Sequence, residues 1–178
     1  MYKLCIITPC SRFENLDTMY ETVKHPSVLW IIVHDSLNHT LKEYENTVQL
    51  ICHRPDGIAG KPQINAALDI LDKLDYHGYC YVLDDDNIIH PDFYKHIFRY
   101  IKKGFNSLIY FNQDVHGVIR IPSLHVGMID QAQYVFHIPT IRFSNQYDGD
   151  GIFVEMLARE HSEYINETLC YYNKLRPL

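Results

Sequence analysis

Residues 79–87 read Tyr-Cys-Tyr-Val-Leu-Asp-Asp-Asp-Asn, an apolar run that ends in three consecutive carboxylates. The run is typical of a buried strand. Because side chains alternate along extended backbone, we expect Asp84 and Asp86 to point one way and Asp85 the other. Two negative charges so near each other require a counter-charge, and carboxylate oxygens are suitable ligands for Mg²⁺ or Mn²⁺. The alternative is a solvated acidic turn, since Asp and Asn are common turn formers.

The sequence around this run favours the metal site. Apolar runs alternate with helical patterns, as in an open α/β sheet, and such sheets bind ligands at the carboxyl ends of their strands. We therefore expect the carboxylates to lie at the ligand-binding edge of the sheet. The expected buried strands of this half cover 4–8, 28–33, 48–52 and 79–83, and the expected helices cover 13–24, 62–71 and 91–101.

The second half of the chain predicts further strands that make the sheet mixed. A short Asn-Gln-Asp turn at 112–114 is expected to join two strands as a hairpin. An acidic loop at 147–151 is expected to lead into a helix with Phe153, Met156 and Leu157 on its inner side. The later strands cover 107–111, 115–121 and 163–172, and the later helix covers 152–161.

Composition limits the class of protein. With 178 residues, 47% of them hydrophobic, the chain has enough apolar material for one compact core. The net charge of −6, from 16 basic and 22 acidic residues, provides no basic field for a nucleic-acid backbone, so we expect no nucleic-acid partner. No repeat or linker divides the sequence. Residues 1–178 therefore predict a single α/β domain with a mixed, mostly parallel sheet flanked by helices.

The cysteines and the N-terminus indicate a reducing compartment. The five cysteines are odd in number, lie mostly inside apolar runs and show no C-x-x-C spacing, so we interpret them as reduced core residues. No stretch reaches the length of a membrane span, and residues 1–3 run directly into the first expected strand. We expect a cytoplasmic protein without a membrane span.

Polar residues that follow the expected strands fit a nucleotide diphosphate. Asp35 can accept a hydrogen bond from a base or a ribose, and Arg12 or Lys61 can meet phosphate. Gly57 lies in the polar segment after the third strand and is a candidate donor contact, with an ordinary turn glycine as the alternative. Its spacing to Gly60 matches no complete phosphate-binding loop of the G-x-x-x-x-G-K-[ST] type. Charged residues usually lie at the surface, so solvated side chains remain the alternative for Arg12 and Lys61.

Four blocks of the sequence, in order, resemble those of glycosyltransferases with a GT-A (Rossmann-like) domain. The pattern is most similar to the glucuronyltransferases of glycosaminoglycan synthesis, and also to small family 2-like domains of large DNA viruses and bacteria. Ile64 departs from it, because the glucuronyltransferases usually carry Arg there. The four blocks are Leu4-Cys5-Ile6-Ile7-Thr8-Pro9-Cys10-Ser11-Arg12, Val28-Leu29-Trp30-Ile31-Ile32-Val33-His34-Asp35, Ile64-Asn65-Ala66-Ala67-Leu68 and Val82-Leu83-Asp84-Asp85-Asp86-Asn87.

The resemblance implies a UDP-sugar as donor substrate and a role for each matching residue. Asp86 is implied to be the principal Mn²⁺ (or Mg²⁺) ligand and Asp84 the second, while Asp84 and Asp85 touch the ribose and the donor sugar. Asp35 is implied to recognise uracil, and Asn65 to contact the donor. The remaining implied nucleotide contacts are Thr8, Pro9 and Arg12.

An inverting transferase also needs a base for the acceptor hydroxyl, and Asp150 and Asp148 are the candidates. The resemblance places a carboxylate at the start of a helix after the second half of the sheet, and Asp150 precedes such a pattern. The alternative is that Asp150 only caps its helix. Asp130 is a further guess for a contact to a sugar hydroxyl.

The sequence thus predicts a metal-dependent glycosyltransferase that moves a hexose from a UDP-sugar to the hydroxyl of a glycan or other acceptor, with inversion. A sugar nucleotidyltransferase would show a Gly-rich loop after the first strand, and residues 8–12 contain no glycine. A receiver domain would carry its acidic pair at the end of that strand, which here reads Thr8-Pro9. A GT-A-like module that binds nucleotide or glycan without turnover stays open.

Overall fold

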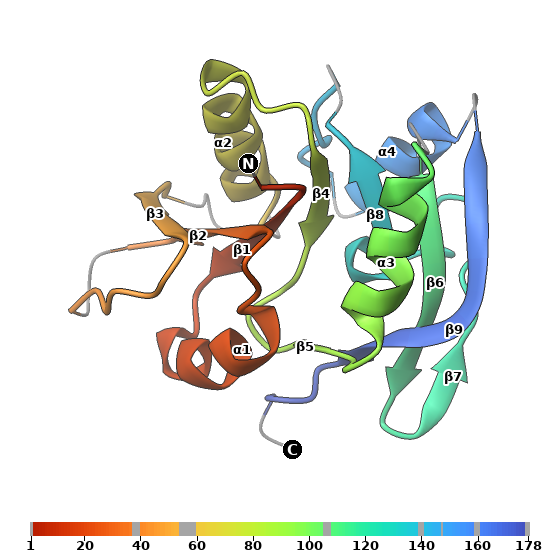
Figure 1. Cartoon of the computed structure of the whole chain (residues 1–178), viewed down its shortest axis with the longest axis horizontal. Coiled ribbons are helices and arrows are strands. Elements are labelled where there is room, and N and C mark those ends of the chain that lie inside the picture. The colour runs from red at the N-terminus through yellow and green to blue at the C-terminus, as the bar shows by residue number, and fades with distance from the viewer. Residues whose placement is uncertain are drawn as a thin grey trace.

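The computed structural model describes residues 2–36, 40–53, 60–104, 108–138, 141–146, 148–158 and 161–176, which build a curled sheet with helices on both faces (Figure 1). The strands are β1 (Leu4–Cys10), β2 (Val28–His34), β3 (Thr47–Ile51), β4 (Tyr79–Val82), β5 (Ile88–Ile89), β6 (Leu108–Val115), β7 (Val118–Arg120), β8 (Tyr134–His137) and β9 (Ser162–Tyr172). The helices are α1 (Leu16–Val23), α2 (Lys61–Lys73), α3 (Phe93–Lys102) and α4 (Gly149–Leu157), with short 3₁₀ turns η1 (Phe13–Asn15) and η2 (Gln131–Gln133).

The described strands form one mixed sheet in the order β3-β2-β1-β4-β8-β6-β9-β5, with β7 paired to β6. The strands β3, β2, β1 and β4 run parallel, and β6 runs parallel to β9. Each antiparallel ladder pairs only two or three residues. Every residue of β1 and β2 is buried, because helices cover both faces there. The expected fold class, a mixed and mostly parallel sheet flanked by helices, is confirmed.

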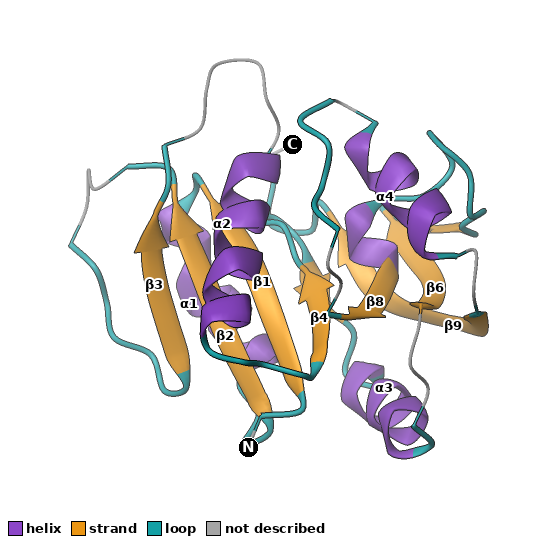
Figure 2. Cartoon of the chain, turned by 90° about the horizontal axis from the view of Figure 1, so that it is seen from above, coloured by secondary structure: helices purple, strands orange, loops and turns teal. Residues whose placement is uncertain are grey.

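Two apolar cores lie on the two faces of the sheet, because successive strand residues point to opposite sides. On one face, Met19 of α1, Ile97 of α3 and Ile6 of β1 belong to one apolar cluster. On the other face, Leu68 of α2 and Phe153 of α4 pack in the cluster that includes alternate residues of the same strands. In Figure 2, α3 and α4 accordingly lie on opposite sides of the strands β6, β8 and β9.

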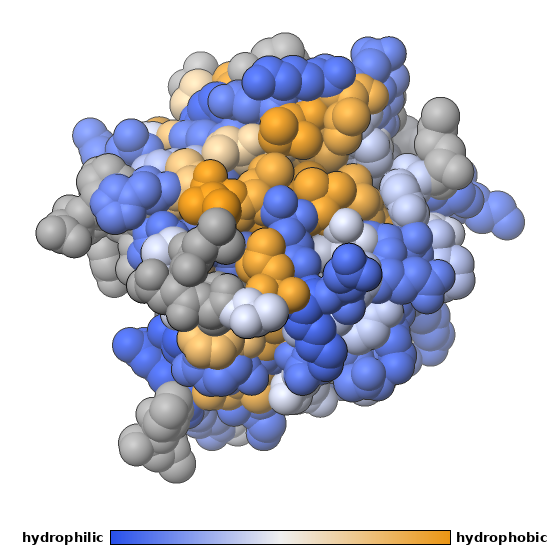
Figure 3. Space-filling view, turned by 90° about the vertical axis from the view of Figure 1, so that its left-hand side faces the viewer, coloured by the Kyte–Doolittle hydropathy of each residue, from blue (hydrophilic) through white to orange (hydrophobic). Residues whose placement is uncertain are grey.

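The strand β3 is an edge strand, which corrects the expectation of a buried strand at 48–52. None of its five residues is fully buried, and Ile51 is 54% exposed. The reason is its position, since β3 has a described neighbour, β2, on one side only. Figure 3 looks onto the side of the molecule that is on the left in Figure 1, where β3 and α2 lie, and shows apolar side chains gathered there.

The hairpin of the second half exists, but the expected turn at 112–114 is wrong. The strand β6 continues through these residues to Val115, and the turn falls at His116 and Gly117, which have φ values of 53° and 87°. Two consecutive positive φ values are typical of the tight hairpin turn that matches strand twist. Of the polar residues that suggested a turn, Asn112 and Gln113 are buried in the strand and Asp114 is half-buried. Asn112 accepts a hydrogen bond from the hydroxyl of Tyr164 at 2.6 Å.

Other sequence expectations in this half are also corrected. The strands β5 and β8 were not expected, because runs of two and four residues give no readable periodicity. The helix α4 begins at Gly149, within the expected loop, and Met156 is 47% exposed instead of facing the core. Phe153 and Val154 make its inner side. The early start of α4 brings the acidic residues of 148–150 to the edge of the sheet where β1 and β4 end.

Candidate active site

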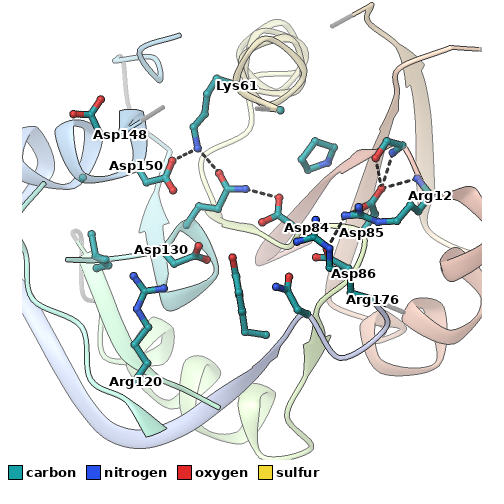
Figure 4. Close-up of a pocket in the computed structure, with 18 of the residues that line it drawn as sticks. Arg12, Lys61, Asp84, Asp85, Asp86, Arg120, Asp130, Asp148, Asp150 and Arg176 are labelled. Carbon is teal, nitrogen blue, oxygen red and sulfur yellow. Dashed lines mark hydrogen bonds and ion pairs between the residues drawn. The ribbon is translucent and has the colours of Figure 1, made fainter. Parts of the chain in front are cut away.

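A cavity of about 520 Å³ opens where β1 and β4 end and where α2, η2 and α4 begin (Figure 4). Its described lining is rich in charge, with carboxylates in excess over cations. Such an excess calls for a cation from a ligand or a metal. The lining aspartates are Asp84, Asp85, Asp86, Asp130, Asp148 and Asp150, and the lining cations are Arg12, Lys61, Arg120 and Arg176.

The acidic triplet lies in a turn, so the expected strand alternation does not apply to it. The strand β4 ends at Val82, and the N–H of Asn87 donates to the carbonyl of Asp84 at 3.0 Å. In this turn Asp85 and Asp86 share a partner, Arg12, whereas Asp84 faces Gln131. The prediction that Asp85 points to the side opposite Asp86 is therefore wrong, since both carboxylates contact Arg12.

Asp85 is a structural anchor for the loop after β1. Its Oδ2 accepts hydrogen bonds from the backbone N–H groups of Ser11 at 2.6 Å and Arg12 at 2.7 Å, and from the Ser11 hydroxyl at 3.0 Å. Its Oδ1 lies 2.6 Å from Nη2 of Arg12. Both oxygens are thus engaged, and the side chain is 3% exposed. The loop that the sequence assigned to nucleotide contact is held in place by the triplet.

Asp86 is buried beside Arg12. Nη2 of Arg12 lies 2.7 Å from Oδ2 of Asp86, whose side chain is 6% exposed. Burial raises the pKa of Asp86, and the Arg12 guanidinium opposes that rise. The ion pair engages one carboxylate oxygen.

Asp84 contacts Gln131 and has a raised pKa. Its Oδ1 accepts a hydrogen bond from Nε2 of Gln131. Burial raises the pKa of Asp84 to about 7, the neighbouring Asp130 carboxylate adds to the rise, and Lys61 opposes it. A carboxylate with such a pKa is stabilised by any cation that enters the cavity.

Lys61, the first residue of α2, points into the same cavity and contacts Asp150 (Figure 4). Its Nζ forms an ion pair with Oδ1 of Asp150 and donates a hydrogen bond to Oε1 of Gln131 at 2.7 Å. Since Gln131 also donates to Asp84, a continuous chain of contacts runs from Asp150 through Lys61 and Gln131 to Asp84. The two acidic groups that the sequence singled out therefore face one cavity.

Two glycines let the start of α4 approach its neighbours closely enough to place Asp150. A Cβ atom at Gly149 would overlap the carbonyl oxygen of Ser144, and one at Gly151 would overlap Cα of Val126. Asp150 lies between them in the first turn, where the helix dipole favours a carboxylate. The N-cap residue is Asp148, whose side chain makes no capping hydrogen bond. Asp150 is thus not the cap of its helix.

The other described residues that the sequence assigned to the site are Pro9, Thr8, Asn65 and Asp35. Pro9 lines it. Thr8 is fully buried, and its hydroxyl accepts a hydrogen bond from Nε1 of Trp30 at 2.9 Å, so its side chain supports the sheet. Asn65 exchanges two hydrogen bonds of 2.9 Å with the backbone of Phe143. The side chains of Thr8, Asn65 and Asp35 do not line the cavity.

Two of the candidate residues need separate mention. Gly57 lies outside the described residues. Asp35 follows β2 and is half-buried, and its N–H donates to the carbonyl of Cys10 at 3.0 Å, so its backbone is tied to the end of β1. Its proposed contact with a base stays a prediction.

Among the lining residues that the sequence interpretation missed are Gln131, Arg120 and Arg176. A signal existed for the first of them. Asp130 and Gln133 form a capping box around η2, in which the Asp130 side chain accepts from Ala132 N–H at 2.9 Å. The D-x-x-Q spacing is typical of such a box and indicates a turn there. Arg120 and Arg176 carry no local signal, because only the sheet order brings them to the cavity.

The donor set fits a divalent cation that binds together with a diphosphate. Among the described residues, no three His, Cys, Asp or Glu side chains are grouped as a metal site. A Mg²⁺ or Mn²⁺ ion bound with substrate phosphates needs only one or two protein carboxylates. Asp85 has both oxygens engaged, whereas the contacts of Asp84 and Asp86 engage one oxygen each. Asp84 and Asp86 are therefore the residues that fit such an ion.

Comparison with known proteins gives a fold but no family. No model of a known protein family and no curated protein matches the sequence. S. aureus TarS 1–349 in complex with UDP is similar in structure, with a TM-score of 0.71 and 15% identity over 95% of this chain and 60% of that one. The same protein in complex with UDP-GlcNAc gives 0.70 and 12%, over 96% and 58%. The chain thus spans about 60% of the length of these two TarS structures.

A second kind of enzyme shares the fold. The 2-C-methyl-D-erythritol 4-phosphate cytidylyltransferase of Francisella tularensis matches with a TM-score of 0.58 and 9% identity, over 96% of this chain and 92% of that one. In the part of the chain that the structure describes, no helix is long and apolar enough to cross a bilayer. At these identities the likenesses establish architecture alone. The chain is an α/β domain with the fold that GT-A enzymes and nucleotidyltransferases share.

Proposed function

We propose that this protein is a metal-dependent glycosyltransferase that moves a hexose from a UDP-sugar to the hydroxyl of a glycan or other acceptor, with inversion. One observation carries the proposal. The carboxylates that fit a metal-diphosphate, Asp84 and Asp86, and a carboxylate on a different element, Asp150, face the same cavity. A single-displacement reaction needs these two functions around one sugar.

The chemistry assigns a step to each group. Asp150 accepts the proton of the acceptor hydroxyl as that oxygen attacks the anomeric carbon of the donor. The new bond forms on the face of the sugar opposite the leaving group, and the bond between the anomeric carbon and the UDP oxygen breaks. Its electron pair leaves with UDP. Arg12 and Arg176 line the cavity near Asp86, and we assign to them the contacts with phosphate oxygens.

A bound Mn²⁺ or Mg²⁺ ion, held by Asp86 and Asp84, would stabilise the negative charge of the departing diphosphate. The UDP-sugar donor is supported by the sequence resemblance and by the structural likeness to TarS, which was solved with UDP and with UDP-GlcNAc. The hexose, the acceptor and the linkage are for experiment to identify.

Titration calorimetry of UDP into the metal-stripped protein, with and without Mn²⁺, tests the donor site. We expect binding with Mn²⁺, and its loss in Asp86→Ala. The matched control is Asp75→Asn, because the side chain of Asp75 is 89% exposed. Asp150→Asn should keep UDP binding and lose transfer by about 10²- to 10⁴-fold, the usual contribution of a general base. Absence of UDP binding in both conditions would refute the proposal.

The second candidate is a nucleotidyltransferase, which the likeness to the cytidylyltransferase favours. This reaction would release pyrophosphate from CTP or UTP in the presence of a sugar phosphate. Against it stands the loop after β1, because a sugar nucleotidyltransferase would show a Gly-rich loop there. Residues 11–15 contain no glycine, and Asp85 holds this loop through Ser11 and Arg12. Pyrophosphate release without hydrolysis or transfer of any UDP-sugar would favour this candidate. Metal-dependent UDP binding without turnover of any donor would indicate a binding module.

A further inference from the structure

We infer that Lys61 is a positioning residue for Asp150, whose carboxylate it keeps ionised and fixed at the cavity. The inference rests on the proposed function, in which Asp150 is the base. It replaces the role that the sequence indicated, since Lys61 was expected to meet the phosphates of the donor. Nothing in the likeness to other structures assigns this residue.

The contacts of Lys61 are directed at Asp150 and Gln131. The Lys61 side chain is 3% exposed, and Nζ pairs with Oδ1 of Asp150 and donates to Oε1 of Gln131 at 2.7 Å. The opposite end of the Gln131 amide donates to Asp84, so both ends of that amide are fixed. Figure 4 shows Lys61 reaching from α2 to Asp150, away from Asp86 and Arg176. An ammonium group held in this way is not at the end of the cavity where Arg12 and Asp86 meet.

The stem of Lys61 is also held by packing. Its Nζ lies 5.6 Å from the centroid of the Phe143 ring, within range of a cation–π contact. A Cβ at Gly149 would lie 3.5 Å from Cε of Lys61, an ordinary packing distance, so the stem runs close beside the start of α4. Asn65, one turn further along α2, fixes the backbone of Phe143 through two hydrogen bonds. The lysine therefore has little freedom to leave Asp150.

The charges around this ion pair come from four elements. Asp84 follows β4, Asp130 precedes η2, Asp148 is the N-cap residue of α4, and Arg120 ends β7. Burial lowers the pKa of Lys61, while the Asp84 and Asp130 carboxylates oppose that change. A lysine buried among carboxylates keeps its charge through a direct counter-ion, and the counter-ion in contact is Asp150.

This arrangement has a chemical consequence for the base. A cation in contact with a carboxylate favours the ionised form, which is the form that accepts the proton of an acceptor hydroxyl. Lys61 engages Oδ1 of Asp150, so Oδ2 is the oxygen assigned to the acceptor. Removing the ammonium group should let Asp150 take up a proton at higher pH. The rate of transfer should then fall at the acid end of the pH profile.

Lys61→Met, Lys61→Arg and Lys73→Met test the inference in the full chain. Lys73 is exposed at the end of the same helix, so its variant is the matched control. UDP binding is measured by calorimetry, and kcat for the donor that the wild type turns over is measured across pH. For Lys61→Met we expect UDP affinity to stay within about threefold and the acid limb of kcat to move up by about one pH unit or more. Lys61→Arg should restore the limb.

The possible outcomes separate the inference from the proposed function. An unmoved acid limb in Lys61→Met, or UDP binding weakened more than about tenfold with kcat unchanged, would overturn the inference and return Lys61 to the phosphates. Absence of turnover by the wild type would overturn the proposed function, and the inference with it. If Lys61→Met does not fold, Lys61→Gln, which keeps a hydrogen-bonding amide without the charge, carries the same comparison.

Discussion

Nη2 of Arg12 lies 2.7 Å from Oδ2 of Asp86, so a cation of the chain itself occupies one side of the carboxylate proposed to hold the metal. The same nitrogen lies 2.6 Å from Oδ1 of Asp85. One guanidinium therefore compensates two buried carboxylates of the turn after β4. In the metal-free protein, this contact links the loop after β1 to the acidic triplet.

Replacing Arg12 with Ala should destabilise the metal-free protein, because two buried carboxylates then lose their cation. Breaking a fully buried pair costs about 3–5 kcal/mol, and the one-third exposure of Arg12 reduces the expected loss to about 2 kcal/mol. Urea denaturation in the presence of a chelator measures it. Arg176→Ala is the control, expected within about 0.5 kcal/mol of the wild type, because Arg176 is exposed. Equal stability of Arg12→Ala and the wild type would contradict the role given to Arg12.

Of two adjacent carboxylates in the triplet, we expect Asp85 to contribute mainly to stability and Asp86 mainly to metal-dependent UDP binding. Asp85→Ala removes the acceptor of three donors at Ser11 and Arg12, and we expect a loss of about 3 kcal/mol. Asp86→Ala leaves Arg12 paired with Asp85, so we expect a loss of about 1 kcal/mol together with loss of metal-dependent UDP binding. Urea denaturation and calorimetry of both variants measure the contrast. Similar stabilities for the two variants would show that the anchor is not Asp85.

Much of the fold could be predicted from the sequence, because burial leaves a local pattern. Strands such as Leu4–Cys10 and Val28–His34 are continuous apolar runs, since helices cover both faces of the sheet at those positions. The turn at His116 and Gly117 was missed for the opposite reason. Buried Asn112 and Gln113 look like turn residues until their partners in the neighbouring strand are known.

The candidate site was predictable only in part, since it is assembled from distant segments. The triplet and Asp150 carry local signals, but their meeting depends on Gln131 and Lys61, which lie in elements far apart in the sequence. The phosphate role expected for Lys61 followed from its charge and its place after a strand. Its direction toward Asp150 follows from α4 beginning at Gly149, which no pattern indicated.

Asp84→Asn should stabilise the metal-free protein at neutral and higher pH. Burial raises the pKa of Asp84 from 3.8 to about 7, so the folded protein binds a proton more readily than the unfolded chain between those values. Stability of the wild type should therefore fall as the pH rises from about 4 to about 7 and stay lower above that. The variant lacks this titration, and we expect a gain of about 2–4 kcal/mol above pH 7.

Urea denaturation across this pH range, in the presence of a chelator, measures the effect. Asp75→Asn is the control, because its exposed carboxylate should leave the pH dependence of the wild type in place. The same variant, Asp84→Asn, should bind UDP with Mn²⁺ more weakly, so the stabilising change is a functional loss. If Asp84→Asn keeps the pH slope of the wild type, another group is responsible for it.

Gly151→Ala tests whether the close approach of α4 places Asp150. In an unhindered helix the change to Ala stabilises by up to about 1 kcal/mol. Here the new Cβ would overlap Cα of Val126 and lie 3.0 Å from N of Gly127. Both are backbone atoms, which cannot move away as the end of a flexible side chain can. Overpacking costs about 1–3 kcal/mol, which exceeds the gain from the change to Ala, so we expect the clash to displace the start of α4. We expect a net loss of stability of about 1–2 kcal/mol and a greater loss of transfer than of UDP binding, because Asp150 moves while the triplet stays.

Met156→Ala in the same helix is the comparison, since Met156 is 47% exposed and should leave both stability and transfer nearly unchanged. Thermal unfolding, UDP calorimetry and a transfer assay on the two variants give the three quantities. A stabilised Gly151→Ala protein with full transfer would show that α4 does not need this contact to present Asp150. Reduced transfer with intact UDP binding would instead assign to Gly151 a role in the alignment of the base.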